Sequence, residues 1–439
     1  RKTVKRKRSK SPLGIGSGLF GISFEKEGGK AYMQYSTFAA IDIGSYDVIL
    51  EIFEISKKQG IRSVDKICHR MELGKDTYTL GKIRPEMEEE LCRVLADFVR
   101  IMEGYRVDDY RATASSAISE ASNSLYVLGK IHQLTGLSVT VLSNSEQRFL
   151  SYKALAAMED NFNKIIEKGT AILDLDGGSF QISLFDKDAL VTTQNIRMGS
   201  LRIRERLAGI QSETEHYEEM VEELIWNEVS SFKKMYLKDR KIENIMLIGD
   251  VFTDSVYQNI EEKTTKIISR ENFNTWYEKI IRQSPMELAV KLGIPLENAS
   301  LMYPSAVIYK CLIDMMGAEH IWIPGVHMTR GIAYEYAEQM KLLKGGHNFE
   351  NDILMAAKNI GKRYAVNRPH VQNLEMTALA MFDATKKMHG MKERERLLLQ
   401  MAVMLHDVGK YISFNNVADS SYNIIMSNEI IGLSHIERE

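Results

Sequence analysis

The sequence predicts a two-lobed α/β fold followed by an all-helical domain. Two segments, residues 38–51 and 171–183, each run from an apolar strand through an acidic, glycine-containing turn into a second strand. After Gly345-Gly346, residues 350–412 show helical periodicity with almost no strand pattern. Because the strand, hairpin and helix order of the first segment recurs in the second, we expect two similar α/β lobes and a third domain of helices.

Composition indicates a soluble globular protein without a nucleic-acid partner. Hydrophobic residues make up 44% of the 439 residues, and the net charge of −2 gives no overall basic field. Basic residues concentrate in residues 1–10, so we expect residues 1–35 to form a basic, disordered tail; an arm that attracts polyanions is the alternative. The absence of an eighteen-residue apolar run argues against a membrane partner. Three widely spaced cysteines fit a reducing compartment, and we expect a cytoplasmic protein.

The first lobe is predicted over residues 36–158. Pro85 suits the first turn of a helix, Gly136 ends another, and Ser143 or Asn144 caps the N-terminus of a third. The predicted elements are a hairpin at 37–53, helices at 85–103, 117–135 and 144–158, and strands within 108–116 and 138–142.

The second lobe is predicted over residues 159–345, and the helical domain over 346–439. The expected elements of the second lobe are strands at 170–175, 180–185, 189–196, 244–248 and 321–323, and helices at 213–237, 286–292 and 305–316.

The two acidic turns have the composition of a phosphate site. A glycine lets the backbone approach phosphate oxygens closely, and a serine supplies a hydroxyl and an N–H donor. Asp42 precedes Gly44-Ser45, and Asp174 and Asp176 precede or begin the turn that ends at Ser179. Taken singly, each turn is also compatible with an ordinary tight turn between strands.

The chain resembles the exopolyphosphatase / guanosine pentaphosphate phosphohydrolase family, within the actin-like superfamily that also contains sugar kinases. The stretches that carry the resemblance are residues 40–45, 112–123, 141–146, 174–179, 198–202 and 403–413. It implies two actin-like (ribonuclease H-like) lobes with an interlobe cleft, and a C-terminal HD-like helical domain. It also implies hydrolysis of a phosphoanhydride in inorganic polyphosphate or in guanosine penta- or tetraphosphate, with Mg²⁺ as cofactor, by a homodimer.

The resemblance also implies roles for individual residues. The implied metal ligands are Asp42, Asp174 and Asp176. The implied phosphate-binding residues are Gly44, Ser45, Gly177, Gly178, Ser179 and Arg202. Glu146 and Gln181 occupy the positions implied to activate or orient the attacking water. Two alternatives stay open: Glu146 is also placed to cap its own helix, and Arg202 to pair with an acidic residue.

Five positions depart from the family pattern. They are Tyr46 for asparagine, Ser119 for arginine, Asp176 for glycine, Gln181 for glutamate and Arg330 for glutamate. A neutral amide orients water but does not accept its proton, so Gln181 is the costliest change. The alternative function is therefore a catalytically weakened sensor that binds polyphosphate or a guanosine alarmone. A kinase is disfavoured, because Gly249-Asp250 lacks the doubled glycine of an adenosine-binding turn.

The helical domain retains only part of an HD-type ligand set. His370 and the pair His406-Asp407 are present. Where the family often has paired histidines before a Ser-Tyr-x-Ile stretch, the chain has Asp419-Ser420-Ser421. The chain reaches Glu439 before a last acidic ligand, so we expect a truncated domain with a structural role. A second metal site is the alternative.

Overall fold

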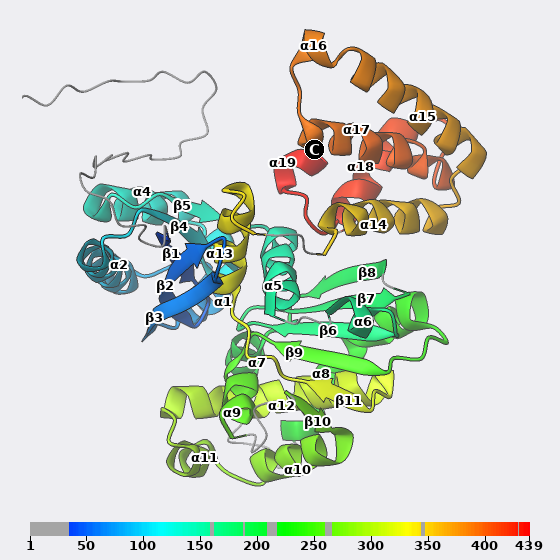
Figure 1. The fold of residues 1–439 in the computed structure, drawn as a ribbon. Coiled ribbons are helices and arrows are strands. Elements are labelled where there is room, and N and C mark those ends of the chain that lie inside the picture. The colour runs from blue at the N-terminus through cyan, green and yellow to red at the C-terminus, as the bar shows by residue number, and fades with distance from the viewer. Residues whose placement is uncertain are drawn as a thin grey trace, which may run out of the picture.

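The structure is a computed structural model that describes residues 35–158, 162–187, 189–208, 217–259, 266–343, 347–428 and 430–439 (Figure 1). The basic tail predicted over residues 1–35 lies outside the described residues, apart from Tyr35. Both predicted α/β lobes and the helical domain are present. Among the described helices, none combines the length and the apolar character that crossing a membrane would need.

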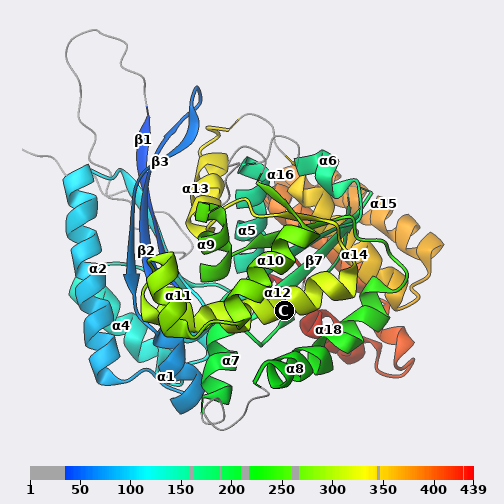
Figure 2. The same ribbon diagram turned by 90° about the horizontal axis from the view of Figure 1, so that it is seen from below.

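The first lobe is built on a five-stranded sheet of order β3-β2-β1-β4-β5. Strand β1 lies at its centre, antiparallel to β2 and parallel to β4. The strands are β1 (Ser36–Ile43), β2 (Asp47–Ser56), β3 (Gly60–Arg70), β4 (Asp109–Ala114) and β5 (Val139–Val141). The helices are α1 (Leu73–Leu80), α2 (Pro85–Tyr105), α3 (Ser116–Ser119), α4 (Ser124–Thr135) and α5 (Asn144–Met158). Figure 2 shows α2 and α4 on the outer side of this sheet, where their apolar residues form one core with it.

The helix predicted over residues 117–135 is interrupted between α3 and α4. The break lies at Asn123, whose side chain forms two hydrogen bonds with the backbone of Ile83. Its Oδ1 accepts from the N–H of Ile83 at 3.0 Å and its Nδ2 donates to the Ile83 carbonyl at 2.8 Å. This tether holds the chain out of helical conformation, a side-chain competition typical of asparagine.

The second lobe repeats the same topology in a six-stranded sheet of order β10-β11-β9-β6-β7-β8. Strand β6 takes the central place of β1, antiparallel to β7 and parallel to β9. The strands are β6 (Thr170–Leu175), β7 (Phe180–Asp186), β8 (Ala189–Ile196), β9 (Asn244–Ile248), β10 (Ile267–Ser269) and β11 (His320–Trp322). The helical elements are α6 (Phe162–Ile166), α7 (Ser200–Leu207), α8 (Tyr217–Phe232), the π-helical turn η1 (Lys233–Leu237), α9 (Val251–Asn259), α10 (Arg270–Ile281), α11 (Pro285–Leu292), α12 (Leu296–Met316) and α13 (Met328–Gln339).

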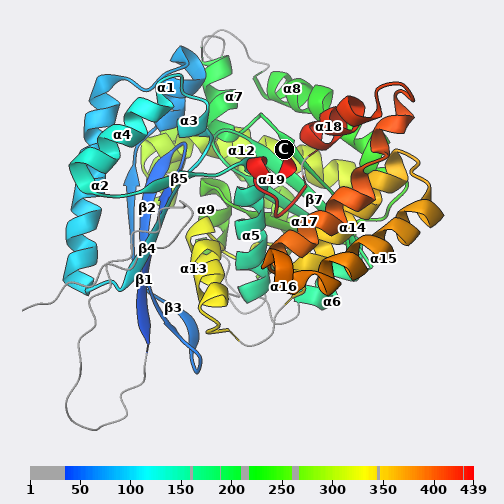
Figure 3. The ribbon, with the colours of Figure 1, turned by 90° about the horizontal axis from the view of Figure 1, so that it is seen from above.

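Helix α13 corrects the predicted lobe boundary. Residues 159–345 were assigned to the second lobe, yet α13 packs on the first sheet, where Tyr336 stacks on Phe38 with ring centroids 4.1 Å apart. It also lies beside α5 (Figures 1 and 3). Gly331 permits this approach, because a Cβ there would lie 2.0 Å from the Leu150 carbonyl oxygen. Apolar contacts with the first sheet, rather than position along the chain, determine the lobe on which α13 packs.

The helical domain is all-α, as predicted, and it covers the outer face of the second sheet. Its elements are α14 (Phe349–Arg363), α15 (Arg368–Ala384), α16 (Lys386–His389), α17 (Glu393–Leu405), the 3-10 turn η2 (Val408–Tyr411), α18 (Val417–Ser427) and α19 (His435–Arg438). Buried side chains of β6 to β9, α5, α14 and α17 form one continuous core. The domain is therefore joined to the second lobe by shared apolar burial, which supplies about 25 cal/mol per Å² of apolar surface removed from water.

Candidate active site between the two lobes

Equivalent strands of the two lobes bring two aspartates to one cavity. Asp42 is the second-last residue of β1, and Asp174 is the second-last residue of β6. Both line a cavity of about 420 Å³ whose walls come from both lobes, which is the predicted interlobe cleft. Gly249, after β9, fits here because it adopts φ +102° and a Cβ would meet Asp174 Oδ1 at 2.5 Å.

Further aspartates line the same cavity. These are Asp47 at the start of β2, Asp176 in the turn after β6, Asp250 after β9, and Asp254 on α9. Burial, strengthened by neighbouring carboxylates, raises the pKa of both Asp47 and Asp174 to about 6 and that of Asp250 to about 7. Burial likewise raises the pKa of Asp42 well above its usual value, and that of Asp176 less strongly. The carboxylates of this cavity therefore repel one another when ionised, and a bound cation would offset their charge.

Several buried polar atoms of this cavity have no hydrogen-bond partner among the described residues. They are Asp42 Oδ1, Ser115 Oγ and Asp250 Oδ2. An unpaired buried polar atom costs about 1–3 kcal/mol, and it is normally satisfied by a ligand, an ion or water. Carboxylate oxygens are ligands that Mg²⁺ prefers, so Asp42, Asp174 and Asp250 fit a magnesium ion.

Positive charge meets the cavity at two places. Lys66 and Arg70 are exposed residues of the edge strand β3 and line the cavity. Arg148, on α5, is buried, and its Nε donates to Gln181 Oε1 at 2.6 Å. The charge of Arg148 opposes the rise of the Asp174 pKa. Cations thus lie both at the rim and beneath the acidic groups.

The two predicted phosphate-binding turns pack against each other. A Cβ on Gly178 would lie 2.2 Å from the Tyr78 hydroxyl, and a Cβ on Gly177 would lie 3.3 Å from Ser45 Cβ. Ser45 is fully buried, and its Oγ lies 2.8 Å from the Tyr78 hydroxyl. Ser45, Gly178 and Ser179 do not line the cavity, and their phosphate-binding role stays a prediction. Close packing at the lobe junction uses their small side chains instead.

Gly44 and Gly177 do line the cavity, as predicted, but their N–H groups are already engaged. The Gly44 N–H donates to the Asp47 carbonyl at 2.8 Å, and the Gly177 N–H donates to Asp176 Oδ1 at 2.6 Å. These bonds stabilise the turns, so a phosphate oxygen would have to compete for the same donors.

For Arg202, the structure shows the acidic-pair alternative. Its Nη2 lies 3.0 Å from Glu120 Oε2, its Nε donates to the Gly178 carbonyl at 2.9 Å, and its guanidinium stacks over the Tyr78 ring. Arg202 does not line the cavity. It joins the lobes at their junction, and a phosphate contact by Arg202 stays a prediction.

Glu146 caps its own helix and is not among the residues that line the cavity. Its Oε2 accepts from the Ser143 N–H at 2.9 Å and from Ser143 Oγ at 2.7 Å, while its own N–H donates to Ser143 Oγ. This is a capping box, which names Ser143 as the N-cap. The next residue, Gln147, lines the cavity together with Ser151 one turn later. The contacts of Glu146 are thus those of the capping alternative, and its water-activating role stays a prediction.

Gln181 and Asp176 lie in the cavity, as predicted. Gln181 is buried, and its amide oxygen is held by Arg148, so the amide orientation is fixed. Two amides, Gln147 and Gln181, thus occupy the cavity walls where a water-activating carboxylate was expected. The sequence pattern missed Gln147 because neighbouring helix residues face different directions.

The other departures from the family pattern have separate structural roles. The Tyr46 hydroxyl donates to Asn298 Oδ1 on α12 at 2.5 Å, which joins the two lobes across the cleft. Ser119 is exposed and does not line the cavity. Arg330 is partly buried on α13, where burial lowers its pKa and Glu51 opposes that shift.

Asp47, Ser115, Arg148 and Asp250 were not identified from the sequence as site residues. For Asp250 a pattern was available, because it follows an apolar strand and a glycine just as the predicted turns do. Ser115 likewise follows strand β4. Nothing local distinguishes Arg148, which reaches the site only through the packing of α5.

Two lobes of equivalent topology around an acidic cavity define a protein of actin-like fold. The chain belongs to the Ppx/GppA phosphatase family, whose model matches residues 52–340. The model for domain III of this family matches residues 354–439. The chain is therefore a member of a family of phosphatases.

Characterised relatives are distant in sequence. A bifunctional 3-dehydroquinate synthase/phosphatase of Fusobacterium nucleatum is 21% identical over 310 residues, which cover 64% of this chain and 44% of the relative. This chain thus spans less than half of that relative. A guanosine-5′-triphosphate,3′-diphosphate pyrophosphatase of Vibrio atlanticus is 18% identical over 408 residues, which cover 91% of this chain and 78% of the relative.

Solved structures share the fold of the two lobes. An exopolyphosphatase from Cytophaga hutchinsonii matches with a TM-score of 0.62 at 17% identity, covering 70% of this chain and 100% of that chain. The Aquifex aeolicus member of the Ppx/GppA family matches with a TM-score of 0.58 at 17% identity, covering 70% and 99%. At this identity the likeness establishes the fold alone.

Proposed function

We propose that the interlobe cavity hydrolyses the terminal phosphoanhydride of inorganic polyphosphate, or the 5′-γ-phosphate bond of guanosine pentaphosphate, with Mg²⁺ as cofactor. The observation that carries the proposal is the convergence of Asp42, Asp174 and Asp250 on one cavity, with unpaired buried oxygens on Asp42 and Asp250. Family membership supports the reaction class. The ion would neutralise charge on the transferring phosphoryl group.

The residues of the chain would position the reactants rather than react with them. Phosphoryl transfer passes through a loose transition state in which orientation and charge stabilisation dominate, and a glutamine is sufficient to orient the attacking water. Gln147 and Gln181 face the cavity, and Arg148 fixes the amide of Gln181. Hydrolysis is therefore compatible with the amides found here.

The rim of the cavity suits an extended polyanion. Lys66 and Arg70 lie four residues apart on β3, which corresponds to about 13 Å along a strand. Charge-assisted contacts at both ends would align a phosphate chain with its terminus at the aspartates. Two relatives carry names that fit: one is called an exopolyphosphatase, and another a guanosine-5′-triphosphate,3′-diphosphate pyrophosphatase. The homodimer implied by the resemblance stays a prediction.

Phosphate release tests the proposal. Untagged protein is incubated with Mg²⁺ and either long-chain polyphosphate or guanosine pentaphosphate, and inorganic phosphate is measured over time. We expect Asp174→Asn to lower kcat at least about 100-fold, since a lost metal ligand removes several kcal/mol of stabilisation. Asp186→Asn is the matched control, because Asp186 ends β7 away from the cavity.

Two outcomes would contradict hydrolysis. Release by the wild type no faster than by Asp174→Asn would exclude catalysis, and if polyphosphate still bound, the weakened sensor would replace the proposal. An equal loss of kcat in Asp186→Asn would mean that the lower activity of Asp174→Asn comes from impaired folding.

A further inference from the structure

We propose that the helical domain positions α5 for the reaction in the interlobe cavity, through a buried cluster formed by Tyr152, His347 and Asp352. Tyr152 lies on α5, His347 precedes α14, and Asp352 lies in the first turn of α14. None of the three lines the interlobe cavity, so they act through other residues of α5. The inference rests on the proposed function, because hydrolysis is one of its two readouts.

The three side chains form a closed hydrogen-bonded group. Asp352 Oδ2 accepts from the Tyr152 hydroxyl at 2.7 Å and lies 2.5 Å from His347 Nε2, which in turn lies 2.6 Å from the same hydroxyl. Tyr152 and Asp352 are buried, and the His347 side chain is only 7% exposed. His347 Nδ1 also lies 2.6 Å from Asn163 Oδ1 on α6. The group therefore joins α5 and α6 to the start of the helical domain.

Aromatic rings enclose this cluster. The ring centroid of Tyr152 lies 5.3 Å from that of Phe162, and 5.2 Å from those of Phe185 and Phe349. The His347 ring lies 5.3 Å from the Phe349 ring and 5.6 Å from the Phe162 ring. In such an apolar setting a hydrogen bond is stronger than in water, because little solvent screens it. The cluster therefore fixes the Tyr152 side chain, and with it this part of α5.

Stability alone does not account for a carboxylate at position 352. Asp352 is fully buried, and its Oδ1 has no hydrogen-bond partner among the described residues. Replacing buried charged groups by apolar side chains of similar volume is often neutral or stabilising, whereas polar groups specify the arrangement of the parts that they join. Orientation of the joined segments is therefore the better explanation of this cluster.

The helical domain also holds the start of α5. The Ser145 hydroxyl is buried and donates to the carbonyl of Leu433, which lies between α18 and α19, at 2.6 Å. Ser145 and Tyr152 are seven residues apart, which is about two helical turns, so both contacts lie on one side of the helix. With contacts at two points, α5 cannot turn about its axis without breaking at least one of them.

The same helix carries a residue that orients a group of the cavity. Arg148 lies one turn before Tyr152, and its Nε donates to Gln181 Oε1 at 2.6 Å. Tyr152, Arg148 and Ser151 also line a small hollow of about 10 Å³, together with Asp174 and Gln181. Because a helix moves as one body, the contacts that fix Tyr152 also fix the direction in which Arg148 holds the Gln181 amide.

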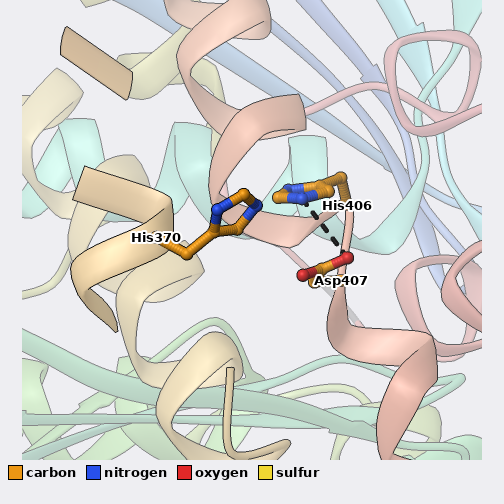
Figure 4. Close-up of side chains that lie close together, drawn as sticks. All are labelled: His370, His406 and Asp407. Atoms are coloured by element: carbon orange, nitrogen blue, oxygen red, sulfur yellow. Dashed lines mark ion pairs between the residues drawn. The ribbon is translucent and has the colours of Figure 1, made fainter. Parts of the chain in front are cut away.

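The cluster is distinct from the other histidine and aspartate group of the domain. The antiparallel pairing of α15 with α17 places Arg396 2.9 Å from Asp383 and, at the opposite ends of these helices, brings His370 beside His406 and Asp407. Figure 4 shows the last three side chains close together, and their ligand atoms lie within 4.8 Å of one another. That group belongs to the HD-type pattern, and a second metal site there stays the alternative to a structural role.

Phosphate release from the full, untagged chain tests the positioning role. Tyr152→Phe removes only the hydroxyl that contacts Asp352, and Asp352→Asn keeps the shape of that side chain. We expect each to lower kcat about 10- to 100-fold, because small misplacements of positioned groups cost up to about 100-fold. KM should not change, because the basic residues proposed to bind the phosphate chain lie on β3 and not on α5.

Amide hydrogen exchange reports the state of α5 without the reaction. In both variants, the peptide that covers residues 144–158 should exchange at least about 10-fold faster than in the wild type, because local opening depends on the contacts that hold an element in place.

A double variant tests the route through Gln181. Gln181→Ala removes the amide that Arg148 holds, so the addition of Tyr152→Phe should then lower kcat by less than about 3-fold more. A full additional loss would overturn the route through Arg148 and Gln181.

Asn359→Leu is the matched control. Asn359 lies on α14, as Asp352 does, and its Nδ2 donates to the Leu190 carbonyl of β8 at 2.8 Å, so this contact joins the domain to the second lobe without involving α5. The substitution should lower the Tm but leave kcat and the exchange of residues 144–158 unchanged. Equal effects of Asn359→Leu and Asp352→Asn would overturn the proposal, because a general loosening of the domain would explain both.

Unchanged kcat and unchanged exchange in folded Tyr152→Phe and Asp352→Asn would also overturn the proposal. If the wild type releases no phosphate, the proposed hydrolysis fails and exchange alone decides. Faster exchange of residues 144–158 in Tyr152→Phe, but not in Asn359→Leu, supports the holding of α5 by the helical domain, and equal exchange overturns it.

Discussion

Glu146 contributes its carboxylate to the first turn of α5, where Ser143 donates to it twice. We therefore expect Glu146→Ala to lower the free energy of unfolding by about 1 kcal/mol, the usual value of such a cap, and to leave kcat unchanged. Urea unfolding and phosphate release measure the two effects. Glu146→Gln, which preserves the capping geometry, is the control. A large loss of kcat in a stable Glu146→Ala protein would restore Glu146 to the chemistry.

Gln181 offers a test in which the substitution is expected to raise kcat. Its amide oxygen already faces the Arg148 guanidinium at 2.6 Å, so a carboxylate in its place would have a buried counter-ion. We expect Gln181→Glu to fold and to raise kcat at least about 10-fold, since a general base contributes roughly 10²–10⁴-fold. Gln194→Glu on the neighbouring strand β8 is the control. An unchanged rate would show that water orientation, not proton acceptance, limits the reaction.

Among the helices, the close approach of α13 to α5 depends on Gly331, which has no side chain. A Cβ on Gly331 would lie 2.0 Å from the Leu150 carbonyl oxygen, and backbone cannot move aside as a flexible side chain can. We expect Gly331→Ala to cost about 3 kcal/mol, the upper range for overpacking.

Gly129→Ala is the matched control for Gly331→Ala. Gly129 lies in α4 with nothing within 4 Å of its ideal Cβ, so the change should stabilise the helix by about 0.5–1 kcal/mol. Thermal unfolding compares both variants with the wild type. Equal effects of the two substitutions would exclude close helix packing as the reason for glycine at 331.

At the scale of the whole molecule, the acidic cavity couples stability to pH. Folding raises the pKa of Asp47 and Asp174 to about 6 and of Asp250 to about 7, so between about pH 4 and 7 the folded state binds more protons than the unfolded state. The contribution of these three carboxyl groups to the free energy of unfolding therefore falls as pH rises through this window.

Bound Mg²⁺ should restore the stability that the cavity loses as pH rises. We expect Mg²⁺ to raise the Tm more at about pH 7.5 than at about pH 5, because the ion competes with protons for the same carboxylates. Thermal unfolding in chelator and in Mg²⁺, at matched ionic strength, measures the difference. Asp250→Asn should flatten the pH dependence of the chelated protein. A Mg²⁺ effect independent of pH would place the ion outside the aspartate cluster.

Local sequence patterns were sufficient to predict the fold class, the two sheets, the helical third domain and the aspartates at the ends of β1 and β6. These follow from local causes: side-chain alternation, helical periodicity, and acidic residues at strand ends. Asp42 and Asp174 could be placed in a common cleft because each follows an apolar strand in a repeated pattern.

Contacts between segments far apart in the sequence determine which residues share the cavity and which do not. Glu146 and Gln147 are adjacent in the sequence, but the orientation of α5 places only Gln147 in the lining of the cleft. Packing of α13 on the first sheet crosses the predicted lobe boundary, and the antiparallel pairing of α15 with α17 brings His370 to His406. In each case the physical reason is the same: contacts between distant segments depend on the direction of side chains and on apolar burial, which local patterns do not specify.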